Sequence, residues 1–227
     1  MKGEDLTETP IGVLVSGSGT NLQALLDADR QHLLGGGTIK VVVSNRPKAQ
    51  AIERAGRANV PAVVINHKKF PDRESFDREM IRVLEEHGVS LVVLAGFMRL
   101  LTPMFLSRFP GRIVNIHPAL LPSFPGVDGQ GQAVSHGVRI SGCTVHFVNA
   151  GVDAGPVIAQ AAVPHLPDEG REPLQQRILA QEHRLFPEVI RWICEGRVWL
   201  DGDRVRYRNL QAAEGALVSP PLDFDSR

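Results

Sequence analysis

The chain of 227 residues has no surplus of charge of either sign, because Lys plus Arg and Asp plus Glu each number 25. This balance disfavours a protein dedicated to nucleic acid or to an acidic membrane surface, since both partners attract basic proteins. No run approaches the ~20 apolar residues that span a bilayer, and the polar start lacks an apolar segment of signal-peptide type. These absences favour a cytoplasmic protein with one well-buried core.

Cysteine is also scarce. Cys143 and Cys194 are the two present, and both stand in apolar runs, which favours free buried thiols over a disulfide. No Cys-x-x-Cys occurs, and the eight histidines include no pair spaced four residues apart. The sequence therefore predicts no metal site.

Short runs that are apolar throughout alternate with helical patterns along the first half of the chain. The expected strands cover residues 11–16, 39–44, 62–65, 91–95 and 113–116. The expected helices cover residues 22–29, 48–58 and 72–86. Strands of this kind, alternating with helices, predict an α/β fold in which a mainly parallel sheet has helices on both faces.

The second half of the chain follows a different pattern. Residues 143–149 and 156–163 read as antiparallel strands, and a long helix over 172–195 should be kinked at Pro187. A hairpin is expected over 199–207, around Asp201-Gly202. We predict three parts, namely a flexible arm at 1–9, a single domain at 10–207 and a weakly ordered tail at 208–227.

The segment from Ser16 to Asn21 is rich in small residues and joins the first strand to the first helix. Free amides at a helix start suit an anion, so a monophosphate site is our preferred interpretation, and a tight turn without a ligand is the alternative. The P-loop lysine is missing. A dinucleotide site is disfavoured because Leu22 stands where its third glycine belongs, and no acid ends the second strand.

Asn115 and His117 stand two residues apart at the end of an expected strand, so they should point to the same side. Pro118 keeps His117 out of helical geometry, and the carboxyl edge of such a sheet is where ligands bind. A carboxylate such as Asp153 could complete an acyl-transfer site there, although Asp153 also suits an ordinary turn.

Two further polar residues have plainer interpretations. His146 lies in the middle of an expected strand, where a structural role is favoured. Glu182 lies in the long helix among Arg and Gln residues, a pattern typical of a solvated face.

Several short segments then make the chain recognisable. They are Ser16-Gly-Ser-Gly-Thr-Asn21-Leu22, Ser44-Asn45, Leu94-Ala-Gly-Phe-Met98-Arg99, Asn115-Ile-His-Pro-Ala-Leu-Leu-Pro122, Pro125-Gly126, Thr144-Val-His-Phe147 and Asp153-Ala-Gly-Pro156. This order resembles that of the phosphoribosylglycinamide formyltransferases of purine synthesis, from about residue 11 to residue 200. Each segment alone is modest evidence, but their shared order is a strong signal.

The resemblance implies a Rossmann-like formyltransferase fold and an enzyme without a metal. The family transfers a formyl group from the cosubstrate 10-formyltetrahydrofolate to the amine of 5-phosphoribosylglycinamide. Its catalytic residues correspond to Asn115, His117 and Asp153. Its ribonucleotide site corresponds to Gly19, Thr20, Asn21 and Glu182. Its formylfolate site corresponds to Arg73, Met98, Arg99, Leu100, Leu101, Asn115, Asn149, Ala150, Gly151, Val152 and Asp153. The family also implies a cis peptide bond at Leu121–Pro122.

The chain departs from the family pattern at two places. After Pro125-Gly126 the family usually has a His two residues on, where this chain has Asp128. Leu179 occupies a position where some relatives carry a polar residue.

The resemblance suggests that the Asn115 amide and a protonated His117 stabilise the oxyanion, while Asp153 favours the imidazolium and helps to handle the amine proton. The expected partners are small-molecule substrates, with no nucleic acid and no membrane, and the chain is expected to be a monomer or homodimer. Another folate-dependent formyltransferase, or a formyltetrahydrofolate hydrolase, is the nearest alternative. A nucleotide-binding module without catalysis is a more distant one.

Overall fold

In the computed structural model, residues 8–209 and residue 217 are described. Seven strands form one sheet in the order β3-β2-β1-β4-β5-β6-β7. Their bounds are β1 Thr9–Val15, β2 Gly37–Ser44, β3 Ala62–Val64, β4 Leu91–Leu94, β5 Ile113–His117, β6 Ile140–Phe147 and β7 Val157–Pro164. The strands β1 to β5 run parallel, β6 pairs antiparallel with both neighbours, and the mainly parallel fold is confirmed.

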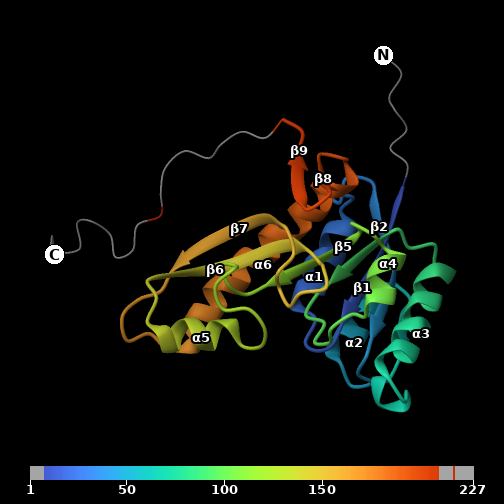
Figure 1. Cartoon of the computed structure of the whole chain (residues 1–227), viewed down its shortest axis with the longest axis horizontal. Helices are drawn as coiled ribbons and strands as arrows, with labels where there is room; N and C mark the ends of the chain where they lie inside the picture. The colour runs from blue at the N-terminus through green and yellow to red at the C-terminus, as the bar shows by residue number, and fades with distance from the viewer. Residues whose placement is uncertain (1–7, 210–216, 218–227) are drawn as a thin grey trace.

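Helices cover both faces of the sheet (Figure 1). Their bounds are α1 Thr20–Arg30, α2 Gln50–Arg57, η1 His67–Lys69, α3 Arg73–Glu86, α4 Pro103–Arg108, α5 Gly129–His136 and α6 Arg171–Cys194. Side chains of α1, α2 and α6 share one buried cluster with Val13, Val42 and Val93. Side chains of α3 and α4 share another with Leu14 and Val92. Successive strand residues thus enter opposite cores, which explains why these strands are apolar throughout.

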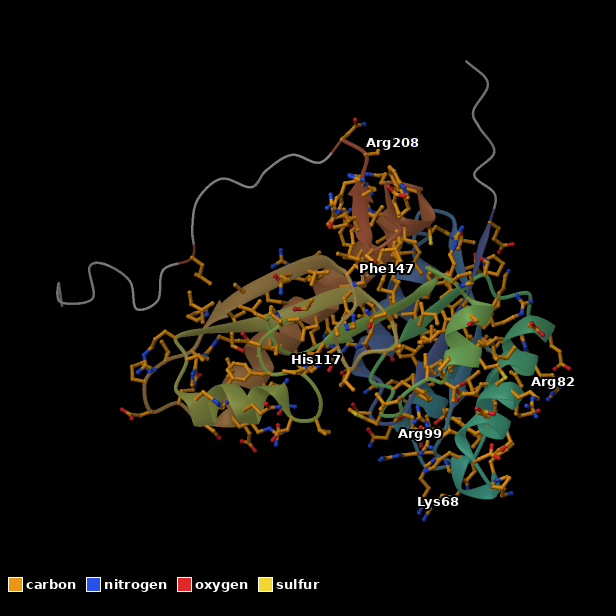
Figure 2. The ribbon with its side chains drawn as sticks, viewed as in Figure 1. Lys68, Arg82, Arg99, His117, Phe147 and Arg208 are labelled. Carbon is orange, nitrogen blue, oxygen red and sulfur yellow. The ribbon has the colours of Figure 1, made fainter. Side chains whose placement is uncertain are left out.

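Most charged side chains lie at the surface of these layers, and apolar side chains fill the space between them. Figure 2 shows Lys68, Arg82 and Arg208 at the periphery, where all three are exposed, whereas His117 and Phe147 are buried. A polar residue such as His117, with 5% exposure, must have partners for its ring nitrogens to avoid a desolvation penalty.

The predicted elements are largely confirmed, with shifted ends. β1 begins at Thr9, earlier than predicted, because its first residues pair with Gly37 and Thr38. β6 begins at Ile140, since it pairs with β7 from Ile140 to His146. The terminal hairpin is present as β8 Val198–Asp201 and β9 Arg204–Tyr207.

The helices α4 and α5 were not predicted, and the peptide bond at Leu121–Pro122 is cis as predicted. Residues 1–7 of the predicted arm and most of the predicted tail lie outside the described residues. Pro187 lies inside α6, and the kink there stays a prediction. Both cysteines are free; Cys143 is buried as predicted, whereas Cys194 is only partly buried.

The order of the strands decides where a ligand can enter. From β1 the chain moves outward to β2 and β3, then returns to the other side of β1 with β4. The connections after β1 and β4 therefore leave the sheet in opposite directions and open a crevice at the carboxyl ends of these strands, the usual ligand position in open α/β sheets.

Candidate active site

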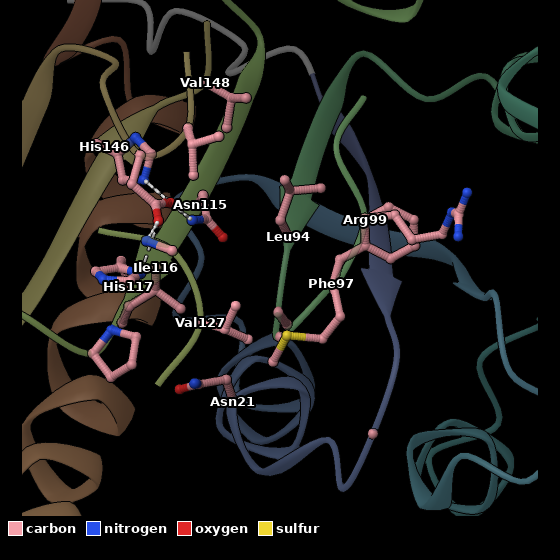
Figure 3. A pocket seen from close by; sticks show the side chains of 18 of the residues that line it. Asn21, Leu94, Phe97, Arg99, Asn115, Ile116, His117, Val127, His146 and Val148 are labelled. Atoms are coloured by element: carbon pink, nitrogen blue, oxygen red, sulfur yellow. Dashed lines mark hydrogen bonds and ion pairs between the residues drawn. The ribbon is translucent and has the colours of Figure 1, made fainter. Parts of the chain in front are cut away.

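A cavity of about 660 Å³ lies at this crevice, within the ~300–1,000 Å³ typical of small-molecule sites. It is lined by residues 17–21 after β1, 94–101 around the end of β4 and 115–118 at the end of β5. Further walls come from residues 126–128 and 148–153, and from α6. Figure 3 shows this space between β5 and the start of α1.

The anion-binding loop predicted from the sequence forms one end of the cavity. Gly19 precedes α1 with a φ of 71°, and no side chain caps the helix. A Cβ on Gly19 would lie 2.7 Å from the Cβ of Ala51, so both the backbone and the packing require glycine. The first amides of α1 thus stay available to an anion.

Glu182 lies beside this loop, from the middle of α6. Its Oε2 accepts a hydrogen bond of 2.8 Å from Nδ2 of Asn21, and the residue is 5% exposed. Burial raises the pKa of Glu182 to about 6, and the Asn21 hydrogen bond opposes that rise. The expectation of a solvated helix face was therefore wrong at Glu182, because this part of α6 packs over the sheet and faces the cavity.

Asn115, His117 and Asp153 lie together at the other end. Asp153 Oδ2 is 3.3 Å from Nδ1 of His117, and Asp153 Oδ1 is 3.5 Å from Nδ2 of Asn115. Asn115 and His117 share a side of β5 because side chains alternate along a strand. Asp153 arrives from the turn before β7, where its φ of 48° is left-handed, a conformation that Asp tolerates better than most residues.

The Asp153 carboxylate is held in its ionised form. Burial alone would raise the pKa of Asp153, but the hydrogen bond from the Gly126 amide and the nearby His117 oppose this effect, and the pKa lies below its usual value. The Gly126 amide donates to Oδ2 over 2.7 Å. An ionised Asp153 can accept a hydrogen bond from Nδ1 of His117.

His117 has a second partner on the loop after β5. Its Nε2 donates to the carbonyl oxygen of Phe124 over 2.8 Å. Because Gly126 also donates to Asp153, the loop is joined to the histidine–aspartate pair at two points.

His146 is the residue whose position the sequence did not indicate. It stands directly opposite Asn115 in the antiparallel β5–β6 register, lines the cavity, and its Nε2 is 3.1 Å from Nδ2 of Asn115. Sequence patterning favoured a structural role for a histidine within a strand. The available signal was its place in the segment Thr144–Phe147, which the family shares.

Three large apolar side chains that line the cavity are exposed, two of them after β4 and one in the turn before β7. Met98 is 63% exposed, Leu100 56% and Val152 48%. Exposed large apolar side chains at a cavity rim suit a flat aromatic ligand. The Met98 amide donates to Ser16 Oγ, and the Thr102 amide to the buried Asp77, so this segment is anchored at both ends.

The sequence-predicted residues fall into two groups. All of the predicted ribonucleotide and catalytic residues, and the segments 98–101 and 149–153, line the cavity. Arg73 is absent from its lining. Its guanidinium instead donates to the carbonyl oxygen of Leu100 over 2.9 Å, and so holds the cavity wall from outside.

The departures from the family pattern also lie at this site. Asp128 caps α5 through the Gly131 amide and forms an ion pair of 2.8 Å with Arg171. Asp128 and Leu179 both line the cavity. Among the described residues, no cluster of three His, Cys, Asp or Glu could hold a metal, and no helix is long and apolar enough to cross a membrane.

Comparisons with known proteins show which family the chain resembles. Residues 10–190 match the model of the formyl transferase family. The chain is 41% identical over 211 residues to the phosphoribosylglycinamide formyltransferase of Escherichia coli, covering 90% of this chain and 99% of that protein. It is 48% identical over 187 residues to the trifunctional purine biosynthetic protein adenosine-3 of Drosophila melanogaster, covering 82% of this chain. The match spans only 14% of that longer relative.

Solved structures give the same result. The glycinamide ribonucleotide transformylase 1 of Symbiobacterium toebii superimposes with a TM-score of 0.87 at 51% identity. That alignment covers 91% of this chain and 97% of the other.

Proposed function

The chain belongs to the formyl transferase family, and on this premise we propose that it transfers the formyl group of 10-formyltetrahydrofolate to the amine of 5-phosphoribosylglycinamide in purine biosynthesis. The observation that carries the proposal is one cavity in which Asn115, His117 and Asp153 lie beside an uncapped helix start. An anion site next to an acyl-transfer constellation suits a phosphorylated amine.

The two substrates occupy different ends of the cavity in this proposal. The phosphate binds at the amides around Gly19, Thr20 and Asn21, and the glycinamide end reaches Glu182. The buried carboxylate of Glu182 suits an amino or amide group, because each offers N–H donors. The formylfolate lies along 98–101 and 149–153, whose exposed apolar side chains suit a pterin ring. Its formyl carbon then lies near Asn115.

The reaction needs one bond made and one bond broken. The amine nitrogen attacks the formyl carbon, the bond from that carbon to N10 of the folate breaks, and one amine proton passes to N10. Negative charge builds on the formyl oxygen on the way. Donation by Asn115 and His117 stabilises that charge, and one such donor is worth ~10²–10³ in rate. Holding both substrates together lowers the barrier further.

Asp153 acts chiefly through its charge in this proposal. The Gly126 amide and His117 hold the pKa of Asp153 below its usual value against the effect of burial, so Asp153 is a weak proton acceptor but a good hydrogen-bond partner for Nδ1 of His117. Both ring nitrogens of His117 already have partners. We propose that the formyl oxygen replaces the Phe124 carbonyl oxygen as the partner of His117 Nε2, while Nδ1 keeps its contact with Asp153.

A spectrophotometric assay of 10-formyltetrahydrofolate tests the proposal directly. Loss of the formyl group only when 5-phosphoribosylglycinamide is present supports transfer. Loss without the amine would instead identify a hydrolase, and ribonucleotide binding without any loss would identify a binding module. The cytoplasmic location and the monomeric or homodimeric state expected from the sequence stay predictions.

A further inference from the structure

His146 makes contacts that restrict where its protons are. Its Nδ1 is 2.9 Å from the carbonyl oxygen of Phe147, which can only accept, so Nδ1 carries a proton. Its Nε2 is 3.1 Å from Nδ2 of Asn115, which can only donate, so Nε2 presents a lone pair. The two contacts together describe a neutral imidazole. The separation of 3.7 Å between Nε2 and Asp153 Oδ1 is too long for a hydrogen bond.

The opposite orientation of the Asn115 amide is disfavoured by the same neighbours. It would place the amide oxygen about where Nδ2 now lies, 3.5 Å from the Asp153 carboxylate oxygen, so that two acceptors would face each other. It would also require a second proton on His146, because Nδ1 must keep its own for Phe147. The neighbours therefore select the orientation seen in Figure 3, with the amide nitrogen toward His146.

His117 differs from His146 in this respect. Both of its nitrogens face acceptors, the Phe124 carbonyl at 2.8 Å and the Asp153 carboxylate at 3.3 Å. These contacts describe a ring with both protons. The contacts of the two histidines therefore differ, since both nitrogens of His117 face acceptors, whereas one nitrogen of His146 faces an acceptor and the other a donor. The titratable groups around His146 are Asp153 and, through it, His117.

We infer that His146 is a positioning residue for the proposed reaction: as a neutral acceptor it holds one N–H of Asn115 and leaves the other for the substrate oxygen. That second N–H has only the long contact of 3.5 Å with Asp153, which a better acceptor in the cavity can replace at small cost. The kinetic consequence rests on the proposed function, whereas the hydrogen bond itself does not.

Two polar substitutions of His146 can show whether this residue positions Asn115 or only fills space. The acceptor of His146→Gln lies near the position of Nε2 and can still reach Asn115. The acceptor of His146→Asn lies near Nδ1 and cannot. We expect His146→Gln to keep kcat within about threefold of the parent and His146→Asn to lose about tenfold or more, with KM for both substrates little changed. Equal kcat values for the two variants would overturn the inference.

A double-mutant cycle with Asn115→Ala tests whether His146 influences kcat through Asn115. If His146 acts through Asn115, His146→Asn should cost less than about threefold in the Asn115→Ala background. An undiminished loss there would show that His146 acts by another route. Melting temperatures of all variants identify any loss that comes from unfolding.

A second measurement does not depend on activity. Nitrogen-15 spectra of the imidazole rings in the wild-type protein at neutral pH should show His146 protonated on Nδ1 alone and His117 protonated on both nitrogens. A doubly protonated His146 would overturn the inference even in an active enzyme. A wild-type protein without transfer would refute the proposed function, and the spectra would still test the His146 contact.

Discussion

Replacing Glu182 with glutamine should stabilise the protein above pH 6 and leave its stability unchanged below pH 4.5. Glu182 is 5% exposed and has one hydrogen bond, from Asn21, to offset the burial of its charge. Burial raises its pKa from 4.5 to about 6, a difference that corresponds to about 2 kcal/mol of unfolding free energy. Glutamine keeps an oxygen that can accept from Asn21 but carries no charge.

The pH window follows from the direction of the shift. A group whose folded pKa lies above its unfolded value contributes fully to stability below the unfolded pKa, and that contribution is lost as the pH rises through the folded pKa. The wild-type protein should therefore lose stability between pH 4.5 and about 6 through this residue, and Glu182→Gln should not. The difference in unfolding free energy between the two proteins should then stay constant at higher pH.

Thermal unfolding of both proteins between pH 4 and pH 8 measures this difference in stability. About 2 kcal/mol corresponds to a rise of roughly 4–8 °C in Tm for a domain of this size. Glu188→Gln is the matched control on the same helix. The hydrogen bond from Arg191 lowers the pKa of Glu188, so this variant should instead be slightly destabilised, by less than about 1 kcal/mol, as pH rises.

The outcome also bears on function. If Glu182 contacts the glycinamide, the more stable variant should bind the ribonucleotide less tightly, a common exchange between stability and activity. Two results would show that the buried charge of Glu182 does not destabilise the protein. One is a difference in Tm between the two proteins that is independent of pH. The other is a Glu182→Gln variant that is less stable than the wild-type protein at pH 8.

Three other substitutions test the site. Asn115→Ala should lower kcat by about 10²–10³ and weaken ribonucleotide binding far less; an equal loss in both would contradict the oxyanion role. Asp153→Asn should lower kcat and alter the pH–rate profile, because its lowered pKa keeps wild-type Asp153 ionised throughout the neutral range; a profile of unchanged shape would exclude it from proton handling. Gly19→Ala should cost about 1–3 kcal/mol of stability and weaken ribonucleotide binding, since Gly19 has a φ of 71° and touches Ala51. Gly17→Ala, with nothing near its Cβ, is the control, and equal effects would refute the steric argument.

Sequence patterns predicted most strands because their apolar runs are long enough to exclude other assignments. They failed for α5, where Gly129 and Gly131 interrupt any helical period. This helix exists because Asp128 caps it and Ala133 packs against Cys143 and Ile178. Neither contact can be read from a short window of sequence.

Some features of the candidate site could likewise be predicted from the sequence, and others could not. The strand end with Asn115 and His117 followed from alternation along β5, and the small-residue loop followed from its place before α1. The burial of Glu182 did not follow from sequence, since its partner Asn21 lies 161 residues away. The contact of His146 with Asn115 depends on the register of two strands 31 residues apart.

The amino-acid sequence by itself determined what is local in this protein. Backbone geometry, side-chain alternation and the free amides after β1 act over a few residues, so a short segment is enough to specify them. Only the tertiary structure decided which polar groups are buried together, because burial and hydrogen-bond partners depend on how distant segments pack. The contact of His146 with Asn115, the pairing of His117 with Asp153 and the burial of Glu182 are all of this second kind.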